Sequence, residues 1–291
     1  MNSRGLTWGL GVTVVLAVLT VAVGVDVLRS PHDGGDAAAP AASRTGETAS
    51  TPAGRDATPS ASPTSGAGAS ASSPSRGKLG DLPPGGPFAT RSSGRYRTVG
   101  APGDQVGRGQ RKVFTYTVEV EDSLNPATYG GDDAFAAMID ATLSDPRSWS
   151  GDPAYAVRHV AATPGTDPDL RIQLTSTGTT HQLCGSQIVL ETSCFYTDGN
   201  RVVLNESRWV RGATTFDGDL GAYRQYVINH EVGHGIGLAA HEPCAGDGRL
   251  APVMMQQTIS LNNRQLHGVD PDEVYPDTDV TCRPNPWPHP S

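Results

Sequence analysis

The alternation of hydrophobic and polar positions divides the chain into three parts. Residues 5–25 carry no charge and are rich in valine and leucine. Between residues 36 and 75 there is no valine, isoleucine, leucine, methionine or aromatic side chain, whereas later apolar residues recur at the spacings of strands and helices. We therefore expect a membrane segment in residues 1–30, a linker in residues 31–95 and one folded domain in residues 96–291.

The folded domain is predicted to begin with short strands and a helix. Runs of β-branched and apolar residues predict strands over residues 112–120, 155–161, 170–175, 187–190 and 201–205. Residues 132–143 predict a helix capped by an aspartate, because Phe135, Ile139 and Leu143 fall on one side. A second helix begins after the cap residue Asp219, and one stripe along it is formed by Leu220, Tyr223, Val227, His230 and His234.

Residues 1–30 predict a single-pass membrane anchor. A stretch of about 20 apolar residues can cross a bilayer, whereas a cleavable signal peptide has a shorter apolar region. Arg4 favours a cytoplasmic N-terminal end, so the folded domain would lie outside the membrane, on the cell-wall side. The small residues Ala22 and Gly24 offer a cleavage site, so secretion is the alternative.

Residues 31–95 predict a disordered linker, because alanine, serine, threonine, proline and glycine bury too little surface to offset chain entropy. The net charge of −8 argues against a nucleic acid partner, since phosphate binding needs a basic face. We expect the protein to be monomeric.

The second helix carries the clearest chemical signal, the motif H-E-x-x-H over residues 230–234. His230 and His234 are four residues apart on one helix face, so they can direct two ring nitrogens at one metal ion. Glu231 projects beside them, where a carboxylate can act as general base on a water. We therefore predict a Zn²⁺ site with His230 and His234 as ligands and Glu231 as the catalytic residue.

A third ligand must come from beyond the helix, because a continuing helix would carry later residues away from the metal. Gly237 predicts the helix end, since glycine adopts a positive φ at low cost. A turn there would bring back His241 as the third ligand, and Glu242 and Asp247 are the alternatives.

The run H-E-x-x-H-x-x-G followed by a histidine resembles the metzincin signature of zinc peptidases. Residues 252–257, P-V-M-M-Q-Q, resemble its Met-turn, which would place Met254 or Met255 beneath the metal. In the metzincin signature the third histidine falls at the position of Ala240, so His241 lies one residue late. Together with C-R-P-N-P-W at residues 282–287, these motifs also resemble a zincin-like domain-of-unknown-function family of high-GC Gram-positive bacteria. The resemblance covers roughly residues 96–291.

The resemblance implies an α+β, metzincin-like fold. Its twisted, mostly parallel sheet would have an antiparallel edge strand and would pack on the zinc-carrying helix, with a short irregular C-terminal part after the Met-turn. The edge strand of such folds pairs with an extended peptide through main-chain hydrogen bonds. Residues 201–205, or the strand before them, are the candidate for this role. Tyr275, which follows the Met-turn, is a candidate donor to an oxyanion or else a packing residue.

The four cysteines are Cys184, Cys194, Cys244 and Cys282. An even number after an export segment favours disulfides, and four cysteines allow three pairings. We expect Cys184–Cys194 and Cys244–Cys282, the second of which would tie the loop after the zinc helix to the C-terminal tail. The alternative is Cys244 as a metal ligand.

The motif and the resemblance together predict a zinc-dependent endopeptidase with a protein or peptide substrate. Two alternatives are a cell-surface binding module with a structural or vestigial zinc, and a hydrolase of cell-wall peptide cross-links. Structural zinc sites have four protein ligands, whereas catalytic sites keep one position open. The number of protein ligands therefore separates an enzyme from a binding module.

Overall fold

A computed structural model describes residues 78–165, 167–185 and 190–290. The expected membrane segment, residues 31–77 of the expected linker and residues 187–189 of one expected strand lie outside these described residues. Within the described ranges, no helix has both the length and the apolar character needed to cross a bilayer.

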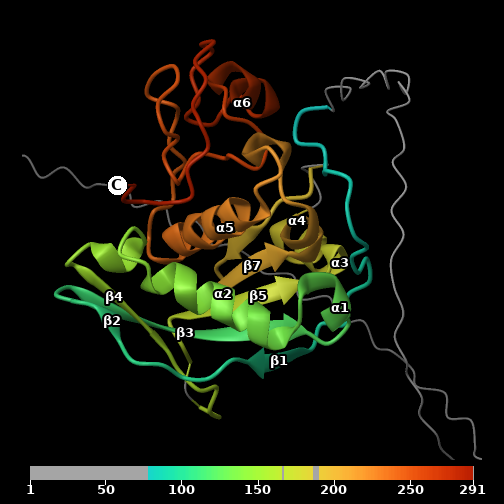
Figure 1. The fold of residues 1–291 in the computed structure, drawn as a ribbon, viewed down its shortest axis with the longest axis vertical. Coiled ribbons are helices and arrows are strands. Elements are labelled where there is room, and N and C mark those ends of the chain that lie inside the picture. Colours follow the sequence, from blue (N-terminus) through green and yellow to red (C-terminus); the bar gives the residue numbers. More distant parts are fainter. Residues whose placement is uncertain (1–77, 166, 186–189, 291) are drawn as a thin grey trace, which may run out of the picture. The chain divides into compact units, whose positions relative to one another are not determined.

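The described residues form an α+β fold around a mixed sheet (Figure 1). Its strands are β1 Tyr96–Val99, β2 Val106–Gly107, β3 Lys112–Glu121, β4 Tyr155–His159, β5 Leu170–Thr175, β6 Cys194–Tyr196 and β7 Arg201–Asn205. Neighbouring strands follow the order β2-β4-β3-β5-β7-β6, and β1 pairs with the second half of β3. Strands β4, β3, β5 and β7 are parallel, whereas β1, β2 and β6 are antiparallel to their partners.

The predicted strands at residues 112–120, 170–175 and 201–205 are confirmed, and the one predicted at residues 155–161 ends at His159. Of the two candidates for the free edge, residues 201–205 are excluded, because β7 pairs with β5 on one side and with β6 on the other. On the β7 side, the last strand of the sheet in the described part of the chain is β6, an antiparallel strand of three residues, and β2 is the last strand at the opposite end.

The helices are α1 Pro126–Tyr129, α2 Asp132–Ser144, α3 Thr177–Cys184, α4 Glu206–Arg211, α5 Leu220–Gly235 and α6 Asn263–Val269. Helices α2 and α5 lie next to each other on one face of the sheet (Figure 1). The N-cap of α2 is Gly131 and not the expected aspartate; Asp132 and Asp133 lie in the first turn, where the helix dipole favours negative charge. The predicted cap of α5 is confirmed, since the Asp219 carboxylate accepts the N–H of Ala222 at 2.9 Å.

Side-chain alternation along the central strands separates an apolar face from a polar one. Val118 and Val120 of β3 and Ile172 of β5 are fully buried in the core that contains α2 and α5. Neighbouring residues of a strand point to opposite sides of its sheet, so Glu119 and Gln173 lie on the other face. The site helix is therefore supported by an apolar layer, while the far face of the sheet is polar.

The fold begins well before residue 96, where we expected the linker to end. The guanidinium of the buried Arg208 donates to the carbonyl oxygens of Gly80 at 2.5 Å and of Asp81 at 3.3 Å. The buried carboxylate of Glu206 accepts the N–H of Ala89 at 2.6 Å. Residues 78–95 are thus a main-chain strap bound to the domain by buried charged side chains.

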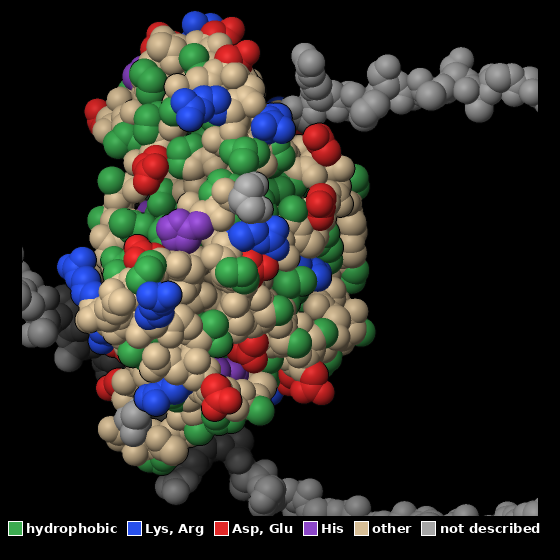
Figure 2. Space-filling view, turned by 60° about the vertical axis from the view of Figure 1, so that its left-hand side comes forward, with side chains coloured by type: hydrophobic (Ala, Val, Ile, Leu, Met, Phe, Trp, Pro, Cys, Tyr) green, Lys and Arg blue, Asp and Glu red, His purple; other side chains and the backbone are tan. Residues whose placement is uncertain are grey.

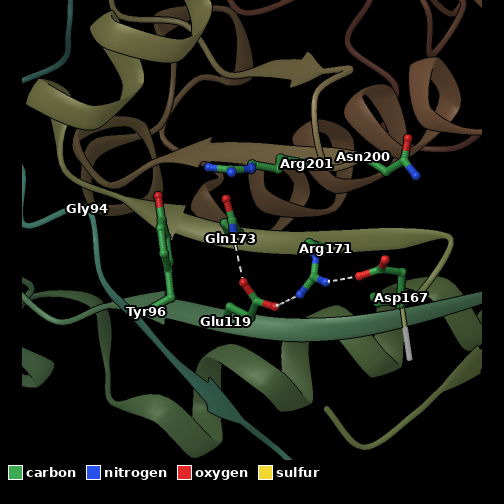
Figure 3. A pocket seen from close by; sticks show the side chains of 10 residues that line it. Gly94, Tyr96, Glu119, Asp167, Arg171, Gln173, Asn200 and Arg201 are labelled. Carbon is green, nitrogen blue, oxygen red and sulfur yellow. Dashed lines mark hydrogen bonds and ion pairs between the residues drawn. The ribbon is translucent and has the colours of Figure 1, made fainter. Parts of the chain in front are cut away.

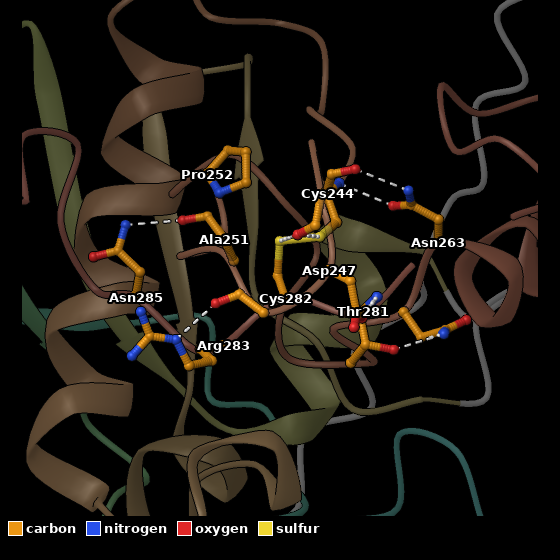
Figure 4. The surroundings of a disulfide bond; sticks show 12 residues. Cys244, Asp247, Ala251, Pro252, Asn263, Thr281, Cys282, Arg283 and Asn285 are labelled. Carbon is orange, nitrogen blue, oxygen red and sulfur yellow. Dashed lines mark hydrogen bonds between the residues drawn. A yellow bond between two sulfur atoms is a disulfide. The ribbon is translucent and has the colours of Figure 1, made fainter. Parts of the chain in front are cut away.

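The C-terminal part after α5 is mostly irregular and has a small core of its own, which includes Met255, Leu266 and Tyr275. The disulfide Cys244–Cys282 lies within this core, as predicted (Figure 4). The Asn263 side chain contacts both main-chain groups of Cys244, accepting from its N–H at 2.9 Å and donating to its carbonyl at 3.0 Å (Figure 4). The cross-link and the amide together hold the chain that follows the third histidine.

The surface carries charges of both signs. On the face drawn in Figure 2, lysine and arginine side chains are interspersed with aspartate and glutamate rather than gathered into one field.

Candidate metal centre

The site is built on the C-terminal half of α5 and on the turn that follows it. The helix ends at Gly235, and Gly237 has a φ of 110°, a left-handed conformation that suits glycine. The N–H of Leu238 donates to the carbonyl of Gly233 at 3.0 Å, and the N–H of Gly237 to that of His234 at 3.1 Å. These two bonds form a Schellman C-cap, so the predicted helix exit at Gly237 is confirmed.

This turn brings the three predicted histidines together. One ring nitrogen from each of His230, His234 and His241 lies within 4.8 Å of the others, so the three surround one small volume. The N–H of Glu242 donates to the carbonyl of Met254 at 3.2 Å, which fixes the segment that carries His241 against residues 252–257. The extra residue before His241 is therefore accommodated in the turn, and these three side chains could hold a metal ion.

Hydrogen bonds to the Nδ1 atoms orient all three rings. Nδ1 of His230 donates to the carbonyl of Val253 at 2.9 Å, and Nδ1 of His234 donates to that of Leu238 at 2.8 Å. Nδ1 of His241 donates to the carboxylate of Glu273 at 3.1 Å. Because a carbonyl can only accept, Nδ1 of His230 and of His234 carries the proton, which leaves Nε2 of a neutral ring as the atom with a free lone pair. Such partners fix the tautomer and the ring orientation of metal ligands.

Two buried atoms at the centre have no hydrogen-bond partner among the described residues: Nε2 of His230 and Oε2 of Glu231. Buried polar atoms are rarely left without partners, because each such atom costs about 1–3 kcal/mol. A cation held by the three rings would satisfy the lone pair of His230. The donor set therefore fits a metal ion, and imidazole nitrogens suit zinc, copper, iron and nickel.

Burial shifts the pKa values of the site so that the neutral form of each group is favoured. Burial, together with the nearby rings of His234 and His241, lowers the pKa of His230 well below its usual value. Burial also lowers the pKa of His234. A low pKa keeps an imidazole neutral near pH 7, and only a neutral imidazole can bind a metal. Burial raises the pKa of Glu231 to about 8, and the positive charge of a bound ion would act in the opposite sense.

Met254 packs against α5 directly behind the histidines. A Cβ atom at Gly233 would overlap Sδ of Met254 and would lie 2.9 Å from Cζ2 of Trp149. Glycine at this position is thus required for the close approach of the Met254 side chain to the helix. Met255 is also buried, but it belongs to the C-terminal core, so the two methionines have different environments.

A cleft of about 410 Å³ opens beside the cluster. It is lined by the three histidines and Glu231, by Cys194 and Phe195 of β6, and by Cys184 at the end of α3. The predicted disulfide Cys184–Cys194 is confirmed and connects α3 to β6 at the rim of this cleft. The sheet edge and the histidine cluster therefore share one cavity.

Among the other candidates of the sequence, Glu242 is exposed, Asp247 and Cys244 have partners elsewhere, and Tyr275 lies against the cluster. Asp247 accepts the N–H of Thr281 at 3.1 Å near the C-terminal disulfide, and Cys244 is in that disulfide. Tyr275 is buried, its hydroxyl accepts the N–H of Gln256 at 2.9 Å, and its ring stacks on His241 with centroids 6.2 Å apart. Tyr275 thus packs on the third histidine, and its hydroxyl already has a partner.

Sequence reasoning missed the residues that support the site. Glu273 contacts His241 across 32 positions of the chain, and no local pattern marks this pairing. The indole of Trp149 donates to the carbonyl of Asn229 at 2.8 Å, and the Asn229 side chain donates to the carbonyl of Pro286 at 2.9 Å. The only available signal was the polar Asn229 next to His230 on a buried helix.

The fold and the cluster define an α+β protein with a potential metal centre. A family model described as "Protein of unknown function (DUF3152)" matches residues 82–290, and the chain belongs to this family. No match was found among curated proteins or among solved structures.

Proposed function

We propose that this protein is a zinc-dependent endopeptidase with a zincin-like fold that acts outside the cytoplasmic membrane. The observation that carries the proposal is the anchoring of three histidine rings through Nδ1 around one volume, next to a buried carboxylate with a free oxygen. Residues His230, His234 and His241 would hold the ion, and Glu231 would be the catalytic base.

Zinc is the ion that this donor set suits best for hydrolysis. Catalytic zinc sites use three protein ligands and keep one position open, and three side chains form the group within the described residues. When bound, zinc supplies Lewis-acid chemistry, which polarises a carbonyl and makes a water more acidic.

Glu231 would move the proton during hydrolysis. Its buried carboxylate lines the same cleft as the three rings, and Oε2 has no other partner among the described residues. The carboxylate would accept a proton from the attacking water and pass it to the amine that leaves when the peptide bond breaks.

The substrate would be an extended peptide that lies along β6. This short strand is the last one beside β7 in the described part of the chain, and two of its residues, Cys194 and Phe195, line the cleft. Main-chain hydrogen bonds to a sheet edge are a general way of binding peptides. We expected this role of residues 201–205 or of the strand before them; because β7 is paired on both sides, the strand that precedes it, Cys194–Tyr196, would take the role.

A location outside the membrane is consistent with the cysteines. Two disulfides, Cys184–Cys194 and Cys244–Cys282, account for all four cysteines, and such bonds persist in oxidising compartments. The apolar residues 5–25 would provide the export signal or the anchor.

The proposal is tested by measuring zinc content and peptide cleavage for the full chain and for Glu231→Gln. The library should contain proteome-derived peptides and cell-wall cross-link peptides. We expect the variant to keep its zinc and to lose cleavage by at least 100-fold, a typical loss for one proton-transfer group. Glu242→Gln, an exposed neighbour of His241, is the matched control and should cleave normally. Undiminished cleavage by Glu231→Gln would remove Glu231 from the mechanism, and a fourth protein ligand would favour a binding module.

A further inference from the structure

A second cavity lies on the polar face of the sheet, away from α5. It has a volume of about 460 Å³ and is lined by residues of β1, β3, β5 and β7, among them Tyr96, Glu119, Gln173 and Arg201 (Figure 3). Gln173 alternates with Ile172 and Leu174, which face the core, so this cavity and the histidine cleft are on different sides of the sheet.

Two polar atoms of this cavity have no hydrogen-bond partner among the described residues: the hydroxyl of Tyr96 and Oε1 of Gln173. The Gln173 side chain is only 3% exposed, and its amide is oriented, because Nε2 donates to Glu119 at 2.7 Å. Oε1 therefore points away from Glu119 and can only accept (Figure 3). A buried polar atom without a hydrogen-bond partner is unfavourable, so these two atoms point to a partner that the described residues do not supply.

The charged residues of the cavity differ in whether they are paired. Arg171 donates to Glu119 at 3.1 Å and to Asp167 at 2.7 Å, so these three form a closed ion-pair network. The side chain of Arg201, by contrast, has no hydrogen bond or ion pair to any residue that the structure describes. Its side chain extends over the same region as the hydroxyl of Tyr96 and the amide oxygen of Gln173 (Figure 3). One unpaired cation, one hydroxyl and one acceptor thus face a common space.

We propose that this cavity binds a small carboxylate that also carries an N–H or O–H donor close to the carboxylate group. Arg201 would pair with the carboxylate, and the hydroxyl of Tyr96 would donate to it. The N–H or O–H of the ligand would donate to Oε1 of Gln173. An N-acylated amino acid and a sugar acid both have this chemistry. The site is independent of the proposed peptidase activity, because it shares no residue with the histidine cleft.

The test is a calorimetric titration of the full chain with N-acetylglycine and with glucuronate. Acetate is the control ligand that lacks the nearby donor, and glucose is the control that lacks the carboxylate. We expect saturable binding of one or both carboxylates, at least tenfold tighter than glucose, which lacks the charge-assisted hydrogen bonds, and roughly threefold or more tighter than acetate, which lacks only the neutral hydrogen bond to Gln173. The relative affinities of the two ligands then identify the source of the carboxylate.

Tyr96→Phe separates a ligand site from a structural one. The hydroxyl has no partner among the residues that the structure describes, so its removal should leave the midpoint of denaturant unfolding unchanged or higher, while the affinity for the carboxylate falls about tenfold. Arg201→Gln should remove the preference for charged over neutral ligands, and Arg158→Gln, an exposed arginine of β4, should not. Absence of saturable carboxylate binding, or binding that neither Tyr96→Phe nor Arg201→Gln weakens, would overturn the proposal.

Discussion

Nδ1 of His241 donates to the carboxylate of Glu273 at 3.1 Å, and this contact joins the segment after α5 to the segment after α6. His241 is the only histidine of the cluster outside the helix, so its ring depends on contacts with the C-terminal part for its orientation. The stacked ring of Tyr275 supports it on one side. The Glu273 carboxylate is therefore a positioning group for the candidate metal centre.

Replacing Glu273 with alanine should weaken metal binding. Loss of a carboxylate that orients a metal-bound histidine typically costs 10–100-fold in affinity, so we expect a fall of about this size. Zinc affinity should be measured by competition with a chelator of known strength. The control is Glu242→Ala, which removes a side chain of the same charge from the residue next to His241. Because the Glu242 side chain is exposed, this substitution should have little effect on zinc affinity. Equal affinities of the two variants would show that Glu273 does not position His241.

Replacing Gly233 with alanine should destabilise the protein although alanine favours helices. The new Cβ would overlap Sδ of Met254 and press on the ring of Trp149. Overpacking of this kind costs about 1–3 kcal/mol, which exceeds the gain in helix propensity of about 1 kcal/mol or less. The matched control is Gly221→Ala in the first turn of α5, where the new Cβ would lie 3.4 Å from Asp219, an ordinary contact. Denaturant unfolding should show a lower free energy of unfolding for Gly233→Ala and no decrease for Gly221→Ala.

Removing the disulfide Cys244–Cys282 should weaken both the fold and the metal site. Its cysteines are 38 residues apart, so the chain-entropy model gives a loss of about 4 kcal/mol for the double serine variant. The same model gives about 3 kcal/mol for Cys184–Cys194, whose cysteines are 10 residues apart. Because the first disulfide holds the segment after His241, its loss should also lower zinc affinity. If the two double variants lose equal zinc affinity, the C-terminal cross-link has no special role in the site.

The sequence predicted those features of the site that depend on local spacing. His230, Glu231 and His234 lie within one turn of a helix, and Gly237 marks its end by a conformation that glycine favours. The position of β7 inside the sheet could not be predicted, because alternation in a strand does not reveal its neighbours. Strand β6 escaped notice since three residues are too short for a pattern.

The strap of residues 78–95 illustrates a different limit. Its composition resembles a linker because many of its contacts are made by main-chain groups, such as the carbonyl of Gly80 and the N–H of Ala89. The residues that bind the strap, Arg208 and Glu206, are charged yet fully buried. Their burial follows from tertiary structure, which a single sequence does not reveal through composition.

Glu121, a second buried carboxylate that binds the strap, should make stability depend on pH. It accepts the N–H of Ser93 at 2.5 Å, the N–H of Ser176 at 2.8 Å and the hydroxyl of Thr179 at 2.8 Å. Burial alone would raise the pKa of Glu121, but these hydrogen bonds outweigh it and hold the pKa below the usual value. Because the folded pKa is lower than the unfolded one, Glu121 stabilises the fold fully above about pH 4.3, the unfolded value, and this contribution is lost as pH falls through the folded pKa.

The variant Glu121→Gln should therefore be less stable than the parent near pH 7, and the difference should shrink below about pH 4. Glutamine offers one acceptor oxygen where the carboxylate offers two, and its amino group would face the N–H donor of either Ser93 or Ser176, which bond to different oxygens of Glu121. Hydrogen bonds to a charged group contribute about 1.5–3 kcal/mol, which sets the expected loss at neutral pH. Urea unfolding at a series of pH values measures this difference, with Glu242→Gln, a change at an exposed residue outside the strap, as the control. A difference that stays constant from pH 7 to pH 3 would mean that the charge of Glu121 does not stabilise the strap.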